Sequence, residues 1–253
     1  MKKFWKKTSL FLVTAAMTVS APLMAWALEH DIVILHTNDI HCGINDNIGF
    51  AGLAQIKKDA LARTPNVALV DAGDAIQGAP IGKLSRGLAV VDIMNYLGYD
   101  FCIPGNHEFD YGMDRFLELV PLQRAGYYCA NFVYAGNNKQ VLPGYKIMQY
   151  EDTKVAFVGA STPESLTTST PTFFQNEKGK YIYSFCEDKT GNKLYKQLQK
   201  NVDKARKDGA DYVFIVGHLG MDGTTPQWSS ESVAQNTQGV DAVIDGHSHE
   251  RFT

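Results

Sequence analysis

The feature that most constrains this chain is a set of metal-ligand-type side chains that follow apolar, strand-like runs at five separate places. In open α/β sheets, binding sites lie at the carboxyl ends of the strands, so these five places are expected to meet at one edge. Five of the chain's seven histidines lie within them. Such a set favours a two-metal hydrolytic centre that attacks phosphate esters or anhydrides. The segments are Asp39-Ile40-His41, Gly73-Asp74, Gly105-Asn106-His107-Glu108, Gly217-His218 and Gly246-His247-Ser248-His249.

The first 27 residues have the pattern of a secretory signal peptide. Four lysines lie within the first seven residues, an apolar stretch covers Ser9 to Leu23, and Ala25-Trp26-Ala27 is a small-x-small cleavage sequence. An uncleaved anchor is the alternative, but the apolar stretch is short and interrupted, whereas a spanning helix needs ~20 mostly apolar residues. We therefore expect residues 1–27 to be removed and the protein to be exported from a bacterium, to the periplasm or the extracellular medium.

Composition restricts the partners of the remaining residues, 28–253. The formal net charge of the whole chain is −3 and no basic stripe is present, so binding to a nucleic-acid polymer has no electrostatic support. No later segment has the length and apolarity of a membrane span. The four cysteines are widely spaced, without a CxxC pair. Cys42, beside His41, could bind a metal, although a small, half-buried packing residue is the favoured interpretation.

Apolar runs bounded by Gly, Pro and Asp alternate with segments of helical spacing, which predicts an α/β domain with a covered sheet. The segment 161–180, rich in Thr, Ser and Pro, is expected to be a loop. Helices are expected over residues 50–62, 84–97, 113–124, 194–207 and 230–235. Strands are expected over residues 32–35, 67–70, 101–103, 128–132, 145–150, 155–158, 212–216 and 242–244.

A resemblance to a known family rests on two longer motifs, His36-Thr37-Asn38-Asp39-Ile40-His41 and Gly105-Asn106-His107-Glu108-Phe109-Asp110. With the three shorter segments, in the same order and rough spacing from residue 31 onward, they resemble the 5′-nucleotidase branch of the calcineurin-like metallophosphoesterases. The resemblance implies a four-layer αββα catalytic domain, with two mixed sheets between helices. Family members continue into further strands, a linker helix and a nucleotide-recognition domain, so a C-terminally truncated or partial chain is expected.

The resemblance also implies which side chains hold two divalent metal ions. A carboxylate can span metals ~3.5–4 Å apart, the separation usual in two-metal hydrolases. Nitrogen and oxygen ligands without sulfur suit Mn, Zn, Fe or Co and do not choose among them. The implied sets are Asp39, His41 and His249 for one ion and Asn106, His218 and His247 for the other, with Asp74 bridging both.

His107 is expected to be catalytic and not a ligand, because it directly follows the ligand Asn106. Asp110, three residues on, could hold its imidazole and favour the protonated form. Family members use this pair to stabilise the transition state and assist the leaving group. Glu108 has no assigned role and is expected to be a solvated or hydrogen-bonded neighbour. His36, at a strand end, is either a hydrogen-bond partner of a ligand or a buried structural residue.

The implied activity is hydrolysis of nucleoside 5′-phosphates for nucleotide salvage, by attack of a hydroxide that bridges the metals. Branch members also hydrolyse UDP-sugars or 2′,3′-cyclic nucleotides, and a superfamily relative frees sulfate from a carrier-bound thiosulfonate. The motifs do not separate these substrates. A metal-binding domain without turnover is the alternative from another class. His107 and Asp110 argue against it, because a pure binding site needs neither.

Overall fold

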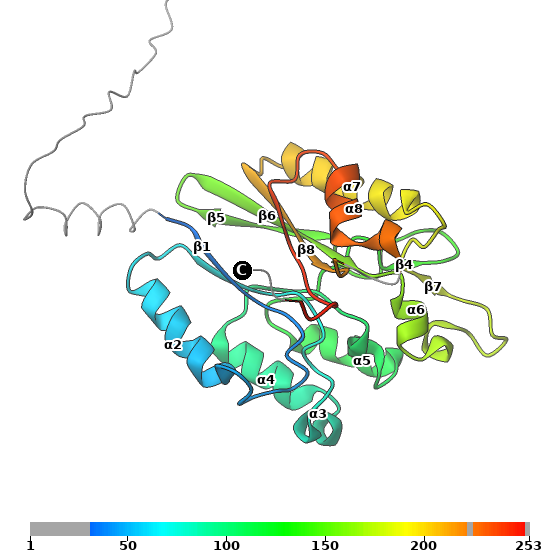
Figure 1. Ribbon diagram of the computed structural model, residues 1–253, viewed down its shortest axis with the longest axis horizontal. Helices are drawn as coiled ribbons and strands as arrows, with labels where there is room; N and C mark the ends of the chain where they lie inside the picture. Colours follow the sequence, from blue (N-terminus) through cyan, green and yellow to red (C-terminus); the bar gives the residue numbers. More distant parts are fainter. Residues whose placement is uncertain (1–30, 222–224, 251–253) are drawn as a thin grey trace, which may run out of the picture.

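The computed structural model describes residues 31–221 and 225–250, so the expected signal peptide and its cleavage site lie outside the described residues. Two β-sheets lie face to face, and helices cover the outer face of each, as Figure 1 shows. The α/β class and the four-layer αββα arrangement expected from the sequence are confirmed. No helix within the described ranges has both the length and the apolar character needed to cross a membrane.

The first sheet contains three parallel strands in the order β1 (Val33–Thr37), β2 (Val67–Asp71) and β3 (Phe101–Cys102). Every residue of β2 is buried, as expected for a central strand that is covered on both faces. The outer face of this sheet packs against apolar side chains of three helices. These are α2 (Gly49–Leu61), α4 (Leu88–Leu97) and α5 (Met113–Leu119).

The second sheet is mixed, whereas the described strands of the first sheet are all parallel, so the expectation of two mixed sheets is correct only for the second. Its first two strands form an antiparallel hairpin and the remaining neighbours are parallel. The helices α7 (Asn192–Lys207) and α8 (Ser230–Asn236) lie over its outer face. Leu194, Leu198 and Val202 recur every four residues along α7 and are fully buried, so one apolar stripe fixes this helix to the sheet. The strand order is β5 (Tyr145–Tyr150), β6 (Thr153–Ser161), β8 (Tyr212–His218) and β9 (Ala242–Ile244).

A thin apolar layer joins the two sheets. Val70 from the first sheet and Val216 from the second belong to it, and both are fully buried. Phe101 stacks on Tyr128 with ring centroids 4.6 Å apart and lies 5.8 Å from the ring of Phe157. Removing this apolar surface from water holds the two sheets together. In this packing, the carboxyl ends of the strands in one sheet lie beside those in the other.

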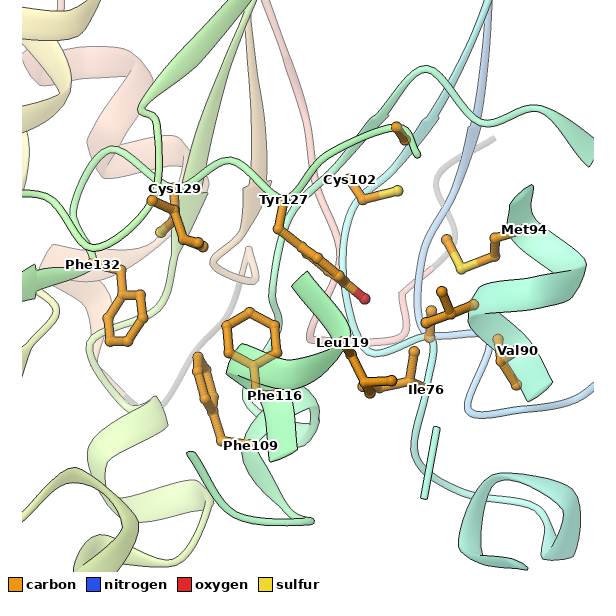
Figure 2. Packing of buried hydrophobic residues seen from close by; sticks show 14 of the residues in the cluster. Ile76, Val90, Met94, Cys102, Phe109, Phe116, Leu119, Tyr127, Cys129 and Phe132 are labelled. Atoms are coloured by element: carbon orange, nitrogen blue, oxygen red, sulfur yellow. The ribbon is translucent and has the colours of Figure 1, made fainter. Parts of the chain in front are cut away.

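A larger aromatic cluster lies on the outer side of the first sheet. Phe109, in the 3-10 turn η1 (His107–Phe109), is its centre and is fully buried. Its ring centroid lies between 4.9 and 5.6 Å from those of four other phenylalanines, in tilted and edge-on arrangements that aromatic rings favour. Figure 2 shows Phe116 and Phe132 on one side of Tyr127, and Met94 on the other. The four phenylalanine neighbours are Phe116, Phe132, Phe174 and Phe185.

Two expected helices end or break earlier than the sequence predicts. The helix expected over 84–97 is two helices, α3 (Pro80–Ser85) and α4, separated by left-handed backbone at Arg86 and Gly87. Continuous helical hydrogen bonding cannot pass through two such residues. The helix expected over 113–124 ends at Leu119 and continues only as the 3-10 turn η2 (Val120–Leu122), where Pro121 lacks an amide donor.

Two further expectations are corrected. The strand expected over 128–132 is absent from those residues, and the short strand β4 (Val133–Tyr134) pairs instead with β7 (Tyr183–Ser184). The expected loop over 161–180 contains the helix α6 (Ser165–Thr168) and the 3-10 turn η3 (Pro171–Phe174). The remaining helix, α8, agrees with the expected helix near 230–235, and its Ser229 side chain accepts a hydrogen bond from the Ser232 amide. A last 3-10 turn, η4 (Pro226–Trp228), precedes it.

Replacing Phe109 by alanine is expected to lower the free energy of unfolding by ~3–5 kcal/mol, because it removes the ring that four other rings contact. Urea unfolding followed by circular dichroism measures this. Tyr96→Ala is the matched control: its side chain is 91% exposed, so it should change stability by no more than about 0.5 kcal/mol. Equal effects of the two substitutions would contradict the assigned core.

Candidate metal centre

The five ligand-type segments meet where the carboxyl ends of the strands of both sheets lie together. Asp39 follows β1, Asp74 follows β2 and Asn106 follows β3, so these three come from the first sheet. His218 is the last residue of β8 and His247 follows β9, so these two come from the second. The expectation that the segments converge on one edge is therefore confirmed, with the addition that the edge is shared by two sheets.

Asp39, His41 and His249 form the first cluster of metal-ligand atoms, with all three atoms within 4.8 Å of one another. The His249 Nε2 atom lies 3.3 Å from Asp39 Oδ1 and 3.4 Å from His41 Nε2. The Nδ1 atom of His41 faces the carbonyl oxygen of Gln77 at 3.2 Å. A carbonyl that accepts from Nδ1 leaves Nε2 as the lone-pair nitrogen, so His41 presents a ligand atom to the cluster.

A second cluster shares Asp39 and adds Asp74 and His218. The His218 Nε2 atom lies 3.0 Å from Asp74 Oδ2 and 3.9 Å from Asp39 Oδ1. His218 Nδ1 is 2.8 Å from the carbonyl oxygen of Ala72, which again leaves Nε2 to face the centre. The two clusters therefore share Asp39, which follows the carboxyl end of β1 in the first sheet.

One oxygen of Asp74 lies between His218, of its own cluster, and His41, of the first cluster. Its Oδ2 is 3.0 Å from His218 Nε2 and 3.8 Å from His41 Nε2. Its Oδ1 accepts a hydrogen bond of 2.8 Å from the amide of His107. The side chain is 2% exposed, so its orientation is set by the protein and not by solvent. This geometry suits a carboxylate that spans two metal positions with one oxygen while the other oxygen anchors the neighbouring loop.

His247 borders the same centre, and Asn106 lies between Gly105 and His107, whose amides donate to Glu108 and Asp74. Asn106 is buried. The His247 ring lies 5.0 Å from the His218 ring, and the His247 amide donates to Asp39 Oδ2 at 3.0 Å. The Nε2 atom of His247 faces Glu164 Oε2 at 3.4 Å. A carboxylate on one ring nitrogen orients the other for a metal, which is a common support of histidine ligands.

Two buried polar atoms at the centre fit a bound cation. Among the described residues, four buried side-chain atoms have no hydrogen-bond partner, and two of them are Asn106 Oδ1 and His218 Nε2. The other two are Tyr127 OH and Asp245 Oδ2. His218 Nε2 is close to Asp74 Oδ2, but the pair lacks the direction of a hydrogen bond. Buried polar atoms without partners are rare and cost about 1–3 kcal/mol each, so such atoms call for an explanation. A divalent cation with nitrogen and oxygen ligands would satisfy both.

The charges at the centre are strongly coupled. Burial acts to lower the pKa of His218, but the adjacent Asp74 carboxylate outweighs it and raises the pKa to about 10. For Asp74, burial acts to raise the pKa and His218 outweighs it, which lowers the pKa to about 2. A cation that binds His218 Nε2 must displace a proton, so binding there is favoured by rising pH.

Five of the seven expected ligands have left-handed backbone, with φ between 46° and 84°. Non-glycine residues adopt this conformation infrequently, and it is found where surrounding structure holds a functional site in place. The loops after β2 and β3 also approach very closely, because a Cβ on Gly105 would lie 2.7 Å from the Asp74 amide nitrogen. The five left-handed ligands are Asp39, His41, Asp74, His247 and His249.

Glu108 joins these two loops. Its Oε2 accepts hydrogen bonds from the amides of Asp74 and Gly105, at 2.7 and 2.6 Å. Its Oε1 accepts from the amides of Ala75 and Ile76, at 2.7 and 3.2 Å. The side chain is 1% exposed, so the solvated alternative is wrong and the hydrogen-bonded one is correct. Burial and the charge of Asp74 raise its pKa to about 7, while the amide donors act in the opposite direction.

His107 and Asp110 form an adjacent pair. The Nδ1 atom of His107 lies 2.6 Å from Asp110 Oδ2, and this hydrogen bond is the main cause that raises the pKa of His107. The ring lies edge-on to that of His41, with centroids 5.2 Å apart. The two side chains are 34% and 22% exposed, so the pair borders the centre from the solvent side.

Two other expectations concern residues beside the centre. Cys42 is 1% exposed and belongs to the apolar core, so it packs as a fully buried residue rather than a half-buried one. All four cysteines are buried and free. His36 is exposed, so the buried structural role is wrong for it.

Comparison with protein families shows to which family the chain belongs. A family model described as calcineurin-like phosphoesterase matches residues 32–251. The chain belongs to this family. The 5′-nucleotidase of Rattus norvegicus is 30% identical over 257 residues, which cover 92% of this chain and 40% of that protein. The chain thus spans about 40% of the length of the curated relatives it matches.

Solved structures agree with the family. The calcineurin-like phosphoesterase YfkN from Bacillus subtilis superposes with a TM-score of 0.74 at 25% identity, over 87% of this chain and 73% of that one. The Termus thermophilus sulfate thiohydrolase SoxB superposes with a TM-score of 0.66 at 27% identity, over 81% of this chain and 35% of that one. The fold expected from the motifs is confirmed by both.

Glu108→Gln is expected to lower the free energy of unfolding by at least about 2 kcal/mol, because its new NH₂ group would face two amide donors that then lack an acceptor. Urea unfolding at pH 8 with a chelator measures the effect without bound metal. Glu118→Gln is the matched control, since Glu118 is 64% exposed and pairs only with Arg115 on the surface. A loss at Glu108 no larger than at Glu118 would contradict its anchoring role.

Proposed function

We propose that this chain is the catalytic domain of an exported, two-metal phosphohydrolase of the 5′-nucleotidase type. The observation that carries the proposal is the position of Asp74 Oδ2, between His41 from one cluster and His218 from the other. Family membership supports the reaction class. Because the chain spans about 40% of its curated relatives, the substrate is part of the proposal.

The proposed ligands are those that the motifs indicated. One divalent ion would be held by Asp39, His41 and His249, whose ligand atoms already cluster. The other would be held by His218, Asn106 and His247, with Asp74 shared. When bound, the ions would lower the pKa of a water and neutralise charge on the phosphate. The donor set suits Mn, Zn, Fe or Co. The proposed ligands in full are Asp39, His41, Asp74, Asn106, His218, His247 and His249.

The residues of the chain supply the proton chemistry. Asp110 holds the His107 imidazole by its Nδ1, which directs Nε2 away from the carboxylate. A protonated imidazole at this position donates to the departing oxygen of the ester and so assists the leaving group. A purely metal-binding domain has no need of this pair.

For the substrate we propose nucleoside 5′-phosphates, with UDP-sugars and 2′,3′-cyclic nucleotides as related possibilities within the branch. Export is supported by the sequence of residues 1–27, which would leave 28–253 as the mature domain in the periplasm or medium. The likeness to a sulfate thiohydrolase makes sulfur-releasing hydrolysis the second candidate. Nucleotide salvage is the proposed cellular role.

Phosphate release from 5′-AMP and from 4-nitrophenyl phosphate, with Mn added, tests the proposed activity. Both esters should be hydrolysed, and a chelator should abolish both rates, because the proposed centre has no other source of an activated water. Turnover of the aryl ester without saturable AMP hydrolysis would assign nucleotide recognition to residues outside this chain. Metal-loaded, folded protein that releases phosphate from neither ester would contradict the proposal in favour of the metal-binding alternative.

His107→Ala is expected to keep the full metal content and to lower kcat for 5′-AMP by about 10²–10⁴-fold, the usual contribution of a positioned proton donor. Metal content is measured by atomic emission on the same samples. Asp203→Ala, on the exposed side of α7, is the control and should leave both quantities unchanged. Equal turnover of His107→Ala and parent at equal metal loading would remove His107 from the mechanism.

A further inference from the structure

The segment that follows β6 touches the centre at three points. The Thr162 amide donates to the carbonyl oxygen of His218 at 2.9 Å. Glu164 Oε2 lies 3.4 Å from His247 Nε2. Ser169 Oγ donates to Asp110 Oδ1 at 2.9 Å. No motif in this Thr- and Ser-rich stretch indicates a part in catalysis. The third contact is the one that bears on the reaction.

Ser169 completes the hydrogen bonding of Asp110. One carboxylate oxygen, Oδ2, faces His107 Nδ1 at 2.6 Å, and the other, Oδ1, accepts from the Ser169 hydroxyl. A carboxylate on its terminal torsion has a broad, roughly two-fold energy profile, so one contact alone leaves it free to swing. A second contact on the opposite oxygen restricts that rotation and keeps Oδ2 directed at the imidazole.

Ser169 is itself held in place. It is 8% exposed, and its amide donates to the Ser165 carbonyl at 3.3 Å as α6 ends. Ser165 in turn donates from both its amide and its hydroxyl to the Thr162 carbonyl. Thr162 directly follows β6 and is bound to the end of β8. The hydroxyl of Ser169 is therefore positioned relative to the second sheet, whereas Asp110 belongs to the first.

The Ser169 side chain does not serve its own helix. The hydroxyls of Thr167 and Thr168 both donate to the Glu164 carbonyl, which is a local contact within α6. Only the amide of Ser169 contributes to ending the helix. Removing the hydroxyl of Ser169 thus removes a contact to the catalytic pair, while removing that of Thr167 removes a contact of the helix to itself.

We propose that Ser169 is a positioning residue for this reaction, which acts by orienting the Asp110 carboxylate and, through it, the His107 imidazole. The proposal rests on the proposed function, in which His107 assists the leaving group. An open hollow beside the pair, lined by Gln77, Asp110, Tyr111 and Ser169, admits water. Water would replace the lost hydroxyl only in part, because it is not fixed to β6.

The test compares Ser169→Ala with Thr167→Ala on two esters in the metal-loaded full chain. An alkyl ester such as 5′-AMP has a poor leaving group and needs the proton donor, whereas 4-nitrophenyl phosphate needs it much less. Ser169→Ala should lower kcat by about tenfold for 5′-AMP and by less than about threefold for the aryl ester. Thr167→Ala should change neither, and Ser169→Thr, which keeps the hydroxyl, should recover most of the rate.

A double-mutant cycle shows whether Ser169 acts through Asp110. In an Asp110→Ala background, Ser169→Ala should cause no further loss, because the oriented group is already gone. Equal losses on both esters, or losses that add fully to those of Asp110→Ala, would overturn the proposal and leave Ser169 a structural residue. Metal content should be the same in every variant.

A spectroscopic measurement separates this proposal from the proposed activity. In protein with ¹⁵N-labelled histidine, the Nδ1 shift of His107 reports its hydrogen bond to Asp110. This shift should move in Ser169→Ala and remain in place in Thr167→Ala. An unmoved shift in Ser169→Ala would overturn the positioning role even if turnover is high, and a moved shift would support it even if the parent hydrolyses neither ester.

Discussion

The carboxylate of Glu108 is the interaction on which the arrangement of the first sheet's ligands depends. Four backbone amides from two loops donate to it, and none of those amides belongs to regular secondary structure. Without this acceptor, the loop after β2 and the loop after β3 would each bury unsatisfied donors. Asp74 and Asn106 lie in these loops, so one buried side chain fixes the relative position of the proposed bridging ligand and a proposed ligand of the second ion.

The sequence predicted the five ligand-type segments and their position at the ends of strands. This was possible because each segment combines a short motif with an adjacent apolar run. Glu108 lay inside one such motif, yet three of its four amide partners, in Asp74, Ala75 and Ile76, are 32 to 34 residues away and could not be seen from spacing. Ser169 was further out of reach, since its contact with Asp110 joins segments 59 residues apart. Residues that orient the ligands are recognised only from their contacts in the folded structure. Residue types that can bind a metal are recognised from the sequence itself.

The fold was predictable to a similar depth. The strands at the centre of each sheet are continuous apolar runs that only a buried position explains, and α7 has a clear one-sided stripe. The strand predicted over residues 128–132 was wrong, because the observed strand β4 has only two residues, Val133 and Tyr134. These two residues form a strand through their pairing with β7 and not through their own composition. The break between α3 and α4 depends on left-handed backbone at Arg86. An arginine does not favour this conformation, so the sequence does not predict the break.

The division of the proposed ligands between two sheets has a mechanical consequence. Three ligand loops are fixed to the first sheet and two to the second, so the gap between the two ligand sets is set by the thickness of the apolar layer between the sheets. The layer includes Ala68, Val70, Phe157 and Val216, none of which is a proposed ligand. The volumes of these side chains set the distance between the two sheets. Evolution of metal preference or metal separation in this architecture is therefore open to changes in side-chain volume in the layer between the sheets, with every ligand left unchanged.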